Sequence, residues 1–352
     1  MNIEFRRLGY DEIINNCFAQ FKAFNDAFCK DIYPDENPDT EDRLKEIIHE
    51  RDCDFYRFTA FDGDRIVGSI SSGKLKPEHP EYSSRKHVSW LEGFVLQQYR
   101  RQGIGRQLVR MALEMAFQNG VEIVKPYTYC DEGFSFIESL GGKAVSAQSD
   151  RTLELDKLDW SQVDSWLKTP IGNLKLEYFS EFSDELMERL IDISFASSQE
   201  VLAMDSCEVP PTPEGERHSL REFSDYMKNT GTGYHCLLLT DETGNILGYT
   251  EGTVPPEDPD VFRQAMTMVL KQHRGKGYGK YLKAAMLDFI RKNLPNIKKQ
   301  VTGNNDLNAP MLAINLKLGF QLVRQWKVYR VEVAKALENL KNVNSKAIAS
   351  KS

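Results

Sequence analysis

The chain contains one domain pattern twice, and this duplication limits its fold more than any other feature of the sequence. Residues 95–108 (VLQQYRRQGIGRQL) align without a gap with residues 269–282 (VLKQHRGKGYGKYL). The opening segments Ile3-Glu4-Phe5 and Leu176-Glu177-Tyr178 also correspond. A chain of 352 residues has room for two domains, and the repeat is far longer than that of a solenoid. We predict an N-terminal domain over 1–157, a linker over 158–173, a C-terminal domain over 174–335 and a frayed tail over 336–352.

Each copy repeats one order of elements: a strand, a charged helical region, a hairpin, a further strand, a glycine-rich turn and a helix. Alternating apolar residues flank Asp62-Gly63 in the first copy and Thr243-Gly244 in the second, which is typical of a hairpin. The helix after the second glycine turn is amphipathic, with an apolar face of Leu282, Ala285, Met286 and Phe289. This order predicts an α/β fold in each copy.

The composition excludes several classes of protein. Lys and Arg number 45 against 52 Asp and Glu, a formal charge of -7, which disfavours nucleic acid as a partner. No apolar stretch approaches the length of a membrane span, and the segment Met1 to Phe5 turns charged at once. We therefore expect a cytoplasmic protein with no membrane partner. The cysteines have neither CxxC nor zinc spacing, so we expect reduced thiols and no metal: Cys17, Cys29, Cys53, Cys130, Cys207 and Cys236.

The glycine turns carry the strongest chemical signal. They read Arg100-x-x-Gly103-x-Gly105 and Arg274-x-x-Gly277-x-Gly279, each between a strand and a helix. Backbone N–H groups at a helix N-terminus bind anions, and glycine lets a ligand approach them closely, so each turn predicts a pyrophosphate site. Neither copy has the P-loop spacing, and leucine stands where the third glycine of a dinucleotide-binding turn belongs.

Both turns resemble the acyl-CoA signature of GCN5-related N-acetyltransferases. The second copy adds Asn308-Ala309-Pro310-Met311 and Asn315-Leu316-Lys317-Leu318-Gly319-Phe320, which are similar to the later helix of that family. Two such domains in one chain resemble the tandem acetyltransferases of the mycothiol synthase type. The resemblance implies a twisted mixed sheet that splays apart at the strand before the glycine turn.

The resemblance also implies the donor and its site. The donor is acetyl-CoA, whose pantetheine would pair with the exposed backbone of that strand while its pyrophosphate contacts the turn. The residues assigned to it in the second copy are Val269, Leu270, Arg274, Gly275, Lys276, Gly277, Tyr278, Gly279, Lys280 and Asn308. Those assigned in the first copy are Val95, Arg100, Arg101, Gly103, Ile104 and Gly105.

The catalytic groups depart from the family pattern. An amine with a pKa of about 10 needs a base before it can attack a thioester. Members of the family commonly use a Glu on the glycine-turn strand as base and a Tyr four residues before the Gly of Gly-Phe as acid. In the second copy that Tyr position is Asn315 and the strand over 263–268 has no carboxylate; in the first copy the Tyr position is Ile137. The first copy does carry Glu92, in a segment similar to the Leu-Glu-Gly strand of aminoglycoside 6′-acetyltransferases.

Four residues are therefore candidates for catalysis. Glu251, on the strand beside the glycine-turn strand, is either a substitute base or a solvent-facing carboxylate at a strand end. Asn315 is a candidate to orient a water or bind pantetheine, and Tyr329 is a candidate contact for the leaving group or the substrate. Glu92 is the candidate base of the first copy.

These features favour an acetyl-CoA-dependent N-acetyltransferase. The acceptor is a primary amine of a small molecule or peptide, which attacks directly in a ternary complex, and the C-terminal copy is expected to be the main active one. The acidic charge balance favours a cationic amine. The alternative is a CoA-binding regulatory module in which one or both copies are catalytically silent.

Overall fold

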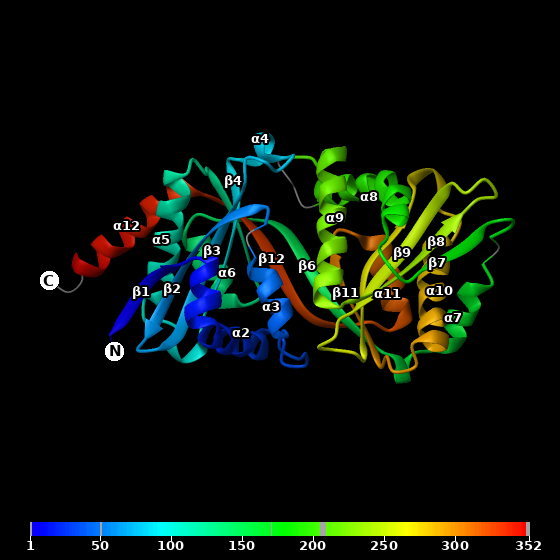
Figure 1. Ribbon diagram of the computed structural model, residues 1–352, viewed down its shortest axis with the longest axis horizontal. Coiled ribbons are helices and arrows are strands. Elements are labelled where there is room, and N and C mark those ends of the chain that lie inside the picture. The colour runs from blue at the N-terminus through cyan, green and yellow to red at the C-terminus, as the bar shows by residue number, and fades with distance from the viewer. Residues whose placement is uncertain (1, 50, 170, 205–208, 350–352) are drawn as a thin grey trace. The chain divides into compact units, whose positions relative to one another are not determined.

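The computed structural model describes residues 2–49, 51–169, 171–204 and 209–349 (Figure 1). The chain forms two compact units. The first unit comprises Met1–Ser146 and Trp326–Ser352, and the second comprises Ala147–Gln325. Each unit has its own run of paired strands and its own buried core, so each is described by itself.

The sheet of the first unit is mixed. Its strands are β1 (Ile3–Leu8), β2 (Cys53–Asp62), β3 (Arg65–Leu75), β4 (Val88–Val95), β5 (Ile123–Thr128) and the end of β12 (Gln321–Glu332). Strands β1 to β4 are antiparallel neighbours, β4 pairs with β5 in parallel, and β5 pairs with β12 antiparallel. Its helices are α1 (Tyr10–Glu12), η1 (Ile13–Cys17), α2 (Phe18–Ile32), α3 (Glu41–Ile48), α4 (Tyr82–Arg85), η2 (Gln97–Tyr99), α5 (Ile104–Gln118), α6 (Asp131–Ser139) and α12 (Val333–Ala349).

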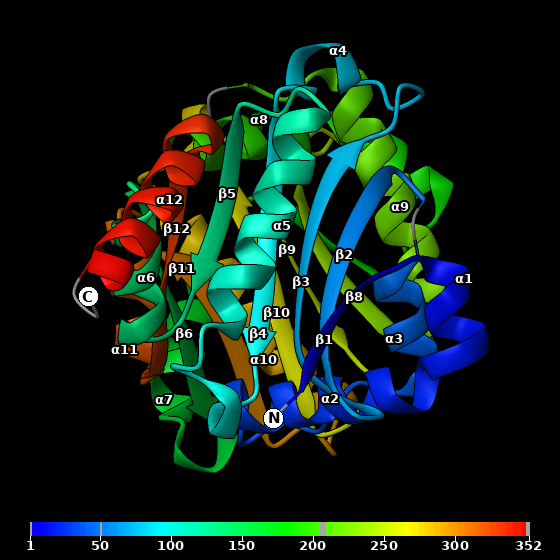
Figure 2. The same ribbon diagram turned by 90° about the vertical axis from the view of Figure 1, so that its left-hand side faces the viewer.

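Helices cover both faces of this sheet. Helix α5 lies across one face (Figure 2), where the side chains of Ile104 and Leu108 approach Gly68 of β3. Helix α2 packs on the opposite face, where its Phe24 and Phe28 contact Phe94 of β4. Ser71 of β3 points to the α2 face, where its hydroxyl donates to Glu92. The α2 face therefore holds the candidate catalytic residue.

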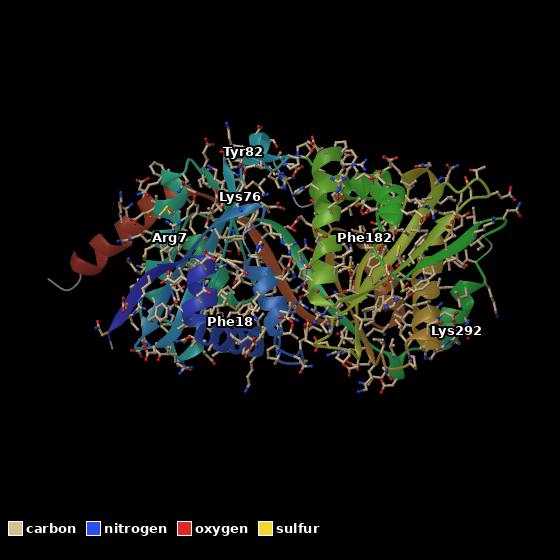
Figure 3. The ribbon with its side chains drawn as sticks, viewed as in Figure 1. Arg7, Phe18, Lys76, Tyr82, Phe182 and Lys292 are labelled. Atoms are coloured by element: carbon tan, nitrogen blue, oxygen red, sulfur yellow. The ribbon has the colours of Figure 1, made fainter. Side chains whose placement is uncertain are left out.

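The second unit repeats this plan. Its strands are β7 (Lys175–Phe179), β8 (Gly233–Thr240), β9 (Ile246–Val254), β10 (Val261–Val269), β11 (Lys299–Asn305) and most of β6 (Lys143–Glu154). Only the β10–β11 pair is parallel among the pairs in the described part of this unit. Its helices are η3 (Leu155–Lys157), α7 (Trp160–Leu167), α8 (Asp184–Met204), α9 (Pro213–Thr230), η4 (Lys271–His273), α10 (Tyr278–Asn293) and α11 (Ala309–Leu318). Phe182, just before α8, packs against Phe223 of α9 and Tyr234 of β8 (Figure 3).

The last strand of each copy lies in the sheet of the other copy's unit. Strand β6 follows the first copy but pairs along 148–154 with β11 of the second unit. Strand β12 follows the second copy but pairs at 327–332 with β5 of the first unit. The compact units thus divide the chain differently from the domains drawn over 1–157 and 174–335. Strand pairing between distant segments decides this division, and a repeat in the sequence does not encode it.

The segments predicted as a tail and as a linker are helical in the described residues. Residues 333–349 form α12, and Ala336 and Leu340 are buried in the core of the first unit. The expectation of a frayed tail from 336 is therefore wrong for this part of α12, because apolar residues at helical spacing anchor it. Within 158–173, α7 buries Val163 and Trp166 in the core of the second unit, and Pro170 lies outside the described residues.

Both sheets splay apart where the resemblance predicts it. Strand β4 pairs with β5 only along Val88–Leu91, and β10 pairs with β11 only along Val261–Gln264. Beyond these points each glycine-turn strand runs on without its parallel neighbour. A bulge between Gln264 and Thr267 marks the same region of β10. The splay exposes strand backbone next to each glycine turn.

Candidate functional site

Each glycine turn opens a helix with unpaired backbone donors. Gly103 and Gly277 are the N-caps of α5 and α10, with φ of 85° and 86°, the left-handed region that favours glycine. Neither helix has a side-chain cap, so no side chain occupies the first N–H groups. The two turns therefore have the same geometry and present donors suited to an anion.

The second glycine of each turn is not required by the packing of the protein. A Cβ at Gly105 would meet only Val95 Cγ2 at 3.6 Å, and one at Gly279 would meet only Ile314 Cδ1 at 3.6 Å. Both are ordinary contact distances, and both residues lie in a helix, where alanine is the better residue. The bare backbone at these two positions fits close approach by a ligand.

Position 101 is the one place where the backbones of the two turns differ in strain. Gly275 has a φ of 81°, whereas Arg101, at the equivalent position of the first copy, has a φ of 63°. A non-glycine residue in this region is uncommon and costs about 1–2 kcal/mol. The first copy thus places an exposed guanidinium next to its turn donors at the expense of local strain.

The signature arginines anchor the turns to the protein. Arg100 Nε donates to the carbonyl of Val95 at 2.9 Å, and Arg274 Nε donates to the carbonyl of Val269 at 2.8 Å. Each guanidinium also pairs with a carboxylate, that of Asp31 on α2 at 2.5 Å and that of Glu200 on α8 at 2.6 Å. The family resemblance assigns both arginines to the CoA donor, and the structure places both in contacts within the protein.

Other cations remain near the turns. Arg101 and Lys276 are exposed, and Lys280 Nζ lies 6.0 Å from the ring centroid of Trp166. Ile104 is buried at the start of α5, so its side chain packs in the core while its backbone N–H stays at the helix N-terminus. The strand ends before the turns carry Val95 in the first copy and Val269 and Leu270 in the second, and α10 begins at Tyr278. The predicted cofactor-binding residues of each turn therefore follow one another along the strand end, the turn and the start of the helix, and Asn308 is the N-cap of α11, whose Ile314 lies next to Gly279.

Glu92 lies on the α2 face of β4 at the splay. Its carboxylate accepts hydrogen bonds from Tyr127 Oη at 2.8 Å and Ser71 Oγ at 3.5 Å. Glu92 is exposed and makes no ion pair with any described residue. Desolvation and the charge of Glu92 raise the pKa of Tyr127, so this hydroxyl stays protonated as a donor.

A cavity of about 1200 Å³ joins Glu92 to the glycine turn of the first unit. Its lining includes Arg100, Gly103 and Gly105 at the turn, and Glu92 on β4. It also includes aromatic side chains from α2, β2, β4 and β5, namely Phe24, Phe28, Tyr33, Phe55, Trp90, Phe94, Tyr127 and Tyr129. One continuous space can therefore contact an anion at the turn and a second molecule beside the carboxylate.

Glu251 of the second unit has an enclosed setting. It is half-buried on β9 and accepts a hydrogen bond from Tyr234 Oη at 2.5 Å. Burial raises the pKa of Glu251 to about 7, although the hydrogen bond from Tyr234 lowers it. Its neighbour across the strands is Cys236, whose thiol is buried.

The two carboxylates occupy neighbouring places on the same face of the two sheets. In the first copy Ser71 of β3 pairs with Glu92 of β4. In the second copy Glu251 stands at the position of Ser71, and Met266, which contacts Ser197 of α8, stands at the position of Glu92. The carboxylate of the second copy therefore lies on β9, the strand next to the one that corresponds to β4. Each carboxylate accepts a hydrogen bond from a tyrosine hydroxyl, in one copy from β5 and in the other from β8.

Buried amides fill the splay of the second unit. Gln264 Nε2 donates to the carbonyl of Glu251 at 2.6 Å, and Gln300 Nε2 donates to Gln264 Oε1 at 2.9 Å. Asn315 is fully buried and donates to Asn304 Oδ1 at 2.6 Å, while its own Oδ1 has no partner in the described part of the chain. An orphaned buried acceptor fits an amide N–H of a pantetheine arm. Asn308 caps α11, with Oδ1 accepting from Met311 N at 3.3 Å.

Tyr329 does not join the site of the second copy. It lies on the part of β12 that belongs to the first unit, is fully buried, and donates to Glu138 Oε1 at 3.0 Å. The proposed contact with a leaving group is therefore wrong, because the strand that carries Tyr329 completes the other sheet. Tyr127, Tyr129 and Tyr33 also line the cavity and were not predicted; the Tyr-Thr-Tyr alternation over 127–129 was an available signal for the first two.

A splayed mixed sheet with a glycine turn at the head of the following helix defines a class of N-acyltransferase. The model of the acetyltransferase (GNAT) family matches residues 21–131 and 199–320. The chain belongs to this family, and is an acyltransferase, with one match in each copy. Members of the family generally use acetyl-CoA as donor.

Solved structures share the tandem fold. A tandem GNAT protein from the clavulanic acid biosynthesis pathway is 21% identical, with a TM-score of 0.74 over 94% of this chain and 99% of that one. A GCN5-related N-acetyltransferase from Sphaerobacter thermophilus is 14% identical, with a TM-score of 0.61 over 94% and 96% of the two chains. A fungal glucosamine N-acetyltransferase region is 14% identical, with a TM-score of 0.62 over 94% of this chain and 38% of that one. No curated protein sequence matches the chain. No helix in the described residues is both long and apolar enough to cross a bilayer.

Proposed function

We propose that this chain transfers the acetyl group of acetyl-CoA to a primary amine by direct attack in a ternary complex, and that the acceptor site lies in the first unit. Membership of the GNAT family supports the reaction class. The amine nitrogen bonds to the acetyl carbon, the carbon–sulfur bond breaks, and the thiolate of CoA takes up a proton. The residues of this chain hold the donor, orient the amine and accept its proton.

The glycine turns support the binding of the donor. The free N–H groups at the N-terminus of α5, with Arg101 and Arg106 nearby, would contact the pyrophosphate. The signature arginine would act indirectly, by fixing the turn to Val95 and Asp31. The second unit has the same turn, so we propose that it also binds CoA.

Glu92 is the proposed base of the first unit. An ammonium with a pKa of about 10 must lose a proton before it attacks, and a carboxylate at the site can take it directly or through one water. Glu92 is exposed to the cavity and has no cation of its own, so it is available for that role. The observation that carries this assignment is the single cavity that contains both Glu92 and the glycine turn.

The second unit offers another candidate, in line with the expectation from sequence that the C-terminal copy is active. A base is most effective when its pKa is near the working pH, and burial raises the pKa of Glu251 to about 7. Against this, Glu251 is engaged by Tyr234, and Asn315 replaces the family tyrosine in a closed amide network. This arrangement also supports the alternative, in which the second copy binds CoA without turnover.

Two isosteric substitutions separate these possibilities. Glu92→Gln should lower kcat by about 10²–10⁴-fold, the usual effect of losing a general base, while leaving CoA affinity unchanged. Glu251→Gln is the matched control and should leave kcat unchanged. Thiol release from acetyl-CoA with a panel of amines measures both. If Glu251→Gln abolishes release and Glu92→Gln does not, the acceptor site belongs to the second unit.

A further inference from the structure

The walls around Glu92 are aromatic. Strand β4 presents Trp90, Glu92 and Phe94 on one face, since alternate residues of a strand share a face. Tyr127 donates to the carboxylate, and its ring lies 5.9 Å from that of Tyr129. The cavity that contains the carboxylate is lined by rings from β2, β4, β5 and α2 and from the residues just after β5 and α2: Phe55, Trp90, Phe94, Tyr127, Phe28, Tyr129 and Tyr33.

Two of these rings remain accessible. Trp90 is 37% exposed and Tyr127 is 38% exposed, although both line the cavity. Trp90 packs edgewise on Phe55, with ring centroids 6.4 Å apart, and covers Gly73 of β3. These rings are held in place on one side and open on the other, so they can contact a flat ligand without a change in the core.

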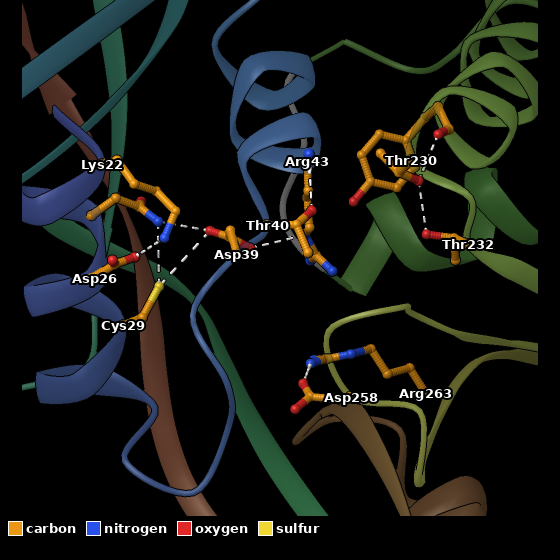
Figure 4. A network of polar contacts seen from close by, with 12 residues as sticks. Lys22, Asp26, Cys29, Asp39, Thr40, Arg43, Thr230, Thr232, Asp258 and Arg263 are labelled. Carbon is orange, nitrogen blue, oxygen red and sulfur yellow. Dashed lines mark hydrogen bonds and ion pairs between the residues drawn. The ribbon is translucent and has the colours of Figure 1, made fainter. Parts of the chain in front are cut away.

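Glu92 is also the carboxylate of this cavity with no fixed compensation. Asp39 pairs with Arg43 at 2.9 Å and accepts from Asn25 (Figure 4). Glu132 lies in the first turn of α6, where the helix dipole stabilises a negative charge. A ligand cation beside Glu92 would therefore meet a carboxylate without an ion pair and several ring faces, with the buried guanidinium of Arg57 one strand beyond Ser71.

We propose that the acceptor is a singly charged arylalkylamine, a primary amine joined by a short alkyl chain to an aromatic ring; this rests on the proposed function of the first unit. The ammonium contacts Glu92, and the ring stacks among Trp90, Tyr127 and their neighbours. Aromatic faces attract both cations and other rings. An amine with several charges would also meet the buried Arg57 of the same lining, and an amine with many hydroxyls would place polar groups against the rings beside Glu92.

Steady-state kinetics of the full chain on four amines tests the class of acceptor. The amines are 2-phenylethylamine, tryptamine, spermidine and kanamycin, with thiol release as readout. We expect kcat/KM for the first two to exceed that for the others by at least about tenfold, the discrimination that a fitted apolar pocket provides. Higher kcat/KM for spermidine or kanamycin would overturn the inference and leave the acetyl transfer intact.

Variants of the rings test the site itself. Trp90→Leu should raise KM for 2-phenylethylamine about 5–30-fold with kcat changed by less than about threefold, as expected from losing a cation–π and stacking partner. Tyr127→Leu should also raise KM, whereas Tyr127→Phe keeps the ring and should leave KM near the value of the parent; kcat is not the readout for this pair, because Tyr127 donates to Glu92. Phe117→Leu, on the exposed surface of α5, is the control and should change neither constant. An unchanged KM in Trp90→Leu would contradict the proposal.

Equilibrium binding distinguishes a failed inference from a failed reaction. Titration of 2-phenylethylamine into the protein with CoA present gives a dissociation constant that needs no turnover. Binding that weakens in Trp90→Leu, with no thiol release from any amine, would support the amine site and overturn the proposed function. No detectable binding, with thiol release from another amine, would overturn the amine class alone.

Discussion

At the scale of single residues, the carboxylates of the two copies differ in their exposure to solvent. Glu92 is exposed and faces a cavity, whereas Glu251 is half-buried beneath Tyr234. The difference follows from the strand that carries each residue, because β9 lies between β8 and β10 while the end of β4 borders the splay. Accessibility favours Glu92 as the base that meets an amine, and the raised pKa favours Glu251 as a group that titrates near neutrality.

The titration of Glu251 should appear in stability. Burial raises its pKa from 4.5 to about 7, so the folded state binds a proton more tightly than the unfolded state. This contribution to stability is complete below pH about 4.5 and is lost as the pH rises through about 7. Glu251→Gln should therefore be more stable than the parent at pH 8.5, by roughly 1–3 kcal/mol, and of similar stability at pH 5.

Urea denaturation at pH 5, 7 and 8.5 measures this difference. Glu242→Gln is the control, since Glu242 is an exposed residue of the β8–β9 turn. If the parent and Glu251→Gln have equal free energies of unfolding at all three pH values, ionisation of Glu251 does not destabilise the folded state. That result would remove the argument for Glu251 as a base near neutrality.

At the scale of elements, the glycine turn could be predicted from the sequence, but the contacts of the arginine that hold it in place could not. The spacing of Gly103 and Gly105 places the turn because positive φ and close approach are local properties of glycine. The contacts of Arg100 with Val95 and Asp31 depend on where α2 packs, and that position is set by the whole sheet. The same pair of contacts recurs at Arg274, so both copies fix the turn in one way.

The turn also provides a substitution that separates binding from folding. Gly105→Ala and Gly279→Ala place a methyl group where the protein has room for it, so each variant should fold with stability equal to or above that of the parent. The methyl would keep a pyrophosphate from the N–H groups, and the affinity for CoA at that turn should fall about 10–100-fold, the value of one or two charge-assisted hydrogen bonds.

Calorimetric titration of CoA into the two single variants and the double variant gives the affinity and the number of sites. We expect two sites in the parent, one in each single variant and none in the double variant over the same concentration range. Gly9→Ala, at a glycine with open space around it before α1, is the control. Unchanged affinity in the folded double variant would contradict the assignment of the turns.

At the scale of the whole molecule, the repeat and the compact units do not coincide. The order of elements and both hairpins followed from local patterns of turn residues, alternation and glycine, whereas the splay followed from the family resemblance. The partners of β6 and β12 did not follow from local patterns, because a strand's own sequence does not say which distant strand it pairs with. The assignment of Tyr329 failed for this reason, since a residue counted in the second copy belongs to the core of the first unit.

The exchange of strands makes the first unit depend on the end of the chain. Residues 326–340 contribute five side chains with at most 2% exposure to its core, Tyr329, Val331, Val333, Ala336 and Leu340. Removing a single large core side chain typically costs 2–5 kcal/mol. The loss of all five would exceed the 5–15 kcal/mol by which a domain is usually stable, and it would also leave the edge of β5 without a partner.

Truncation after Gln325 should therefore unfold the first unit and abolish acetyl transfer if the acceptor site lies there. Scanning calorimetry and limited proteolysis should show the loss of one cooperative transition, with cleavage within residues 2–146. Truncation after Asn342 is the matched control: it keeps Leu340, the last buried side chain among those described, and should preserve both transitions and activity. A chain ending at Gln325 that keeps a folded, active first unit would show that β12 and α12 are dispensable, and the two copies would then be independent domains as the repeat alone implies.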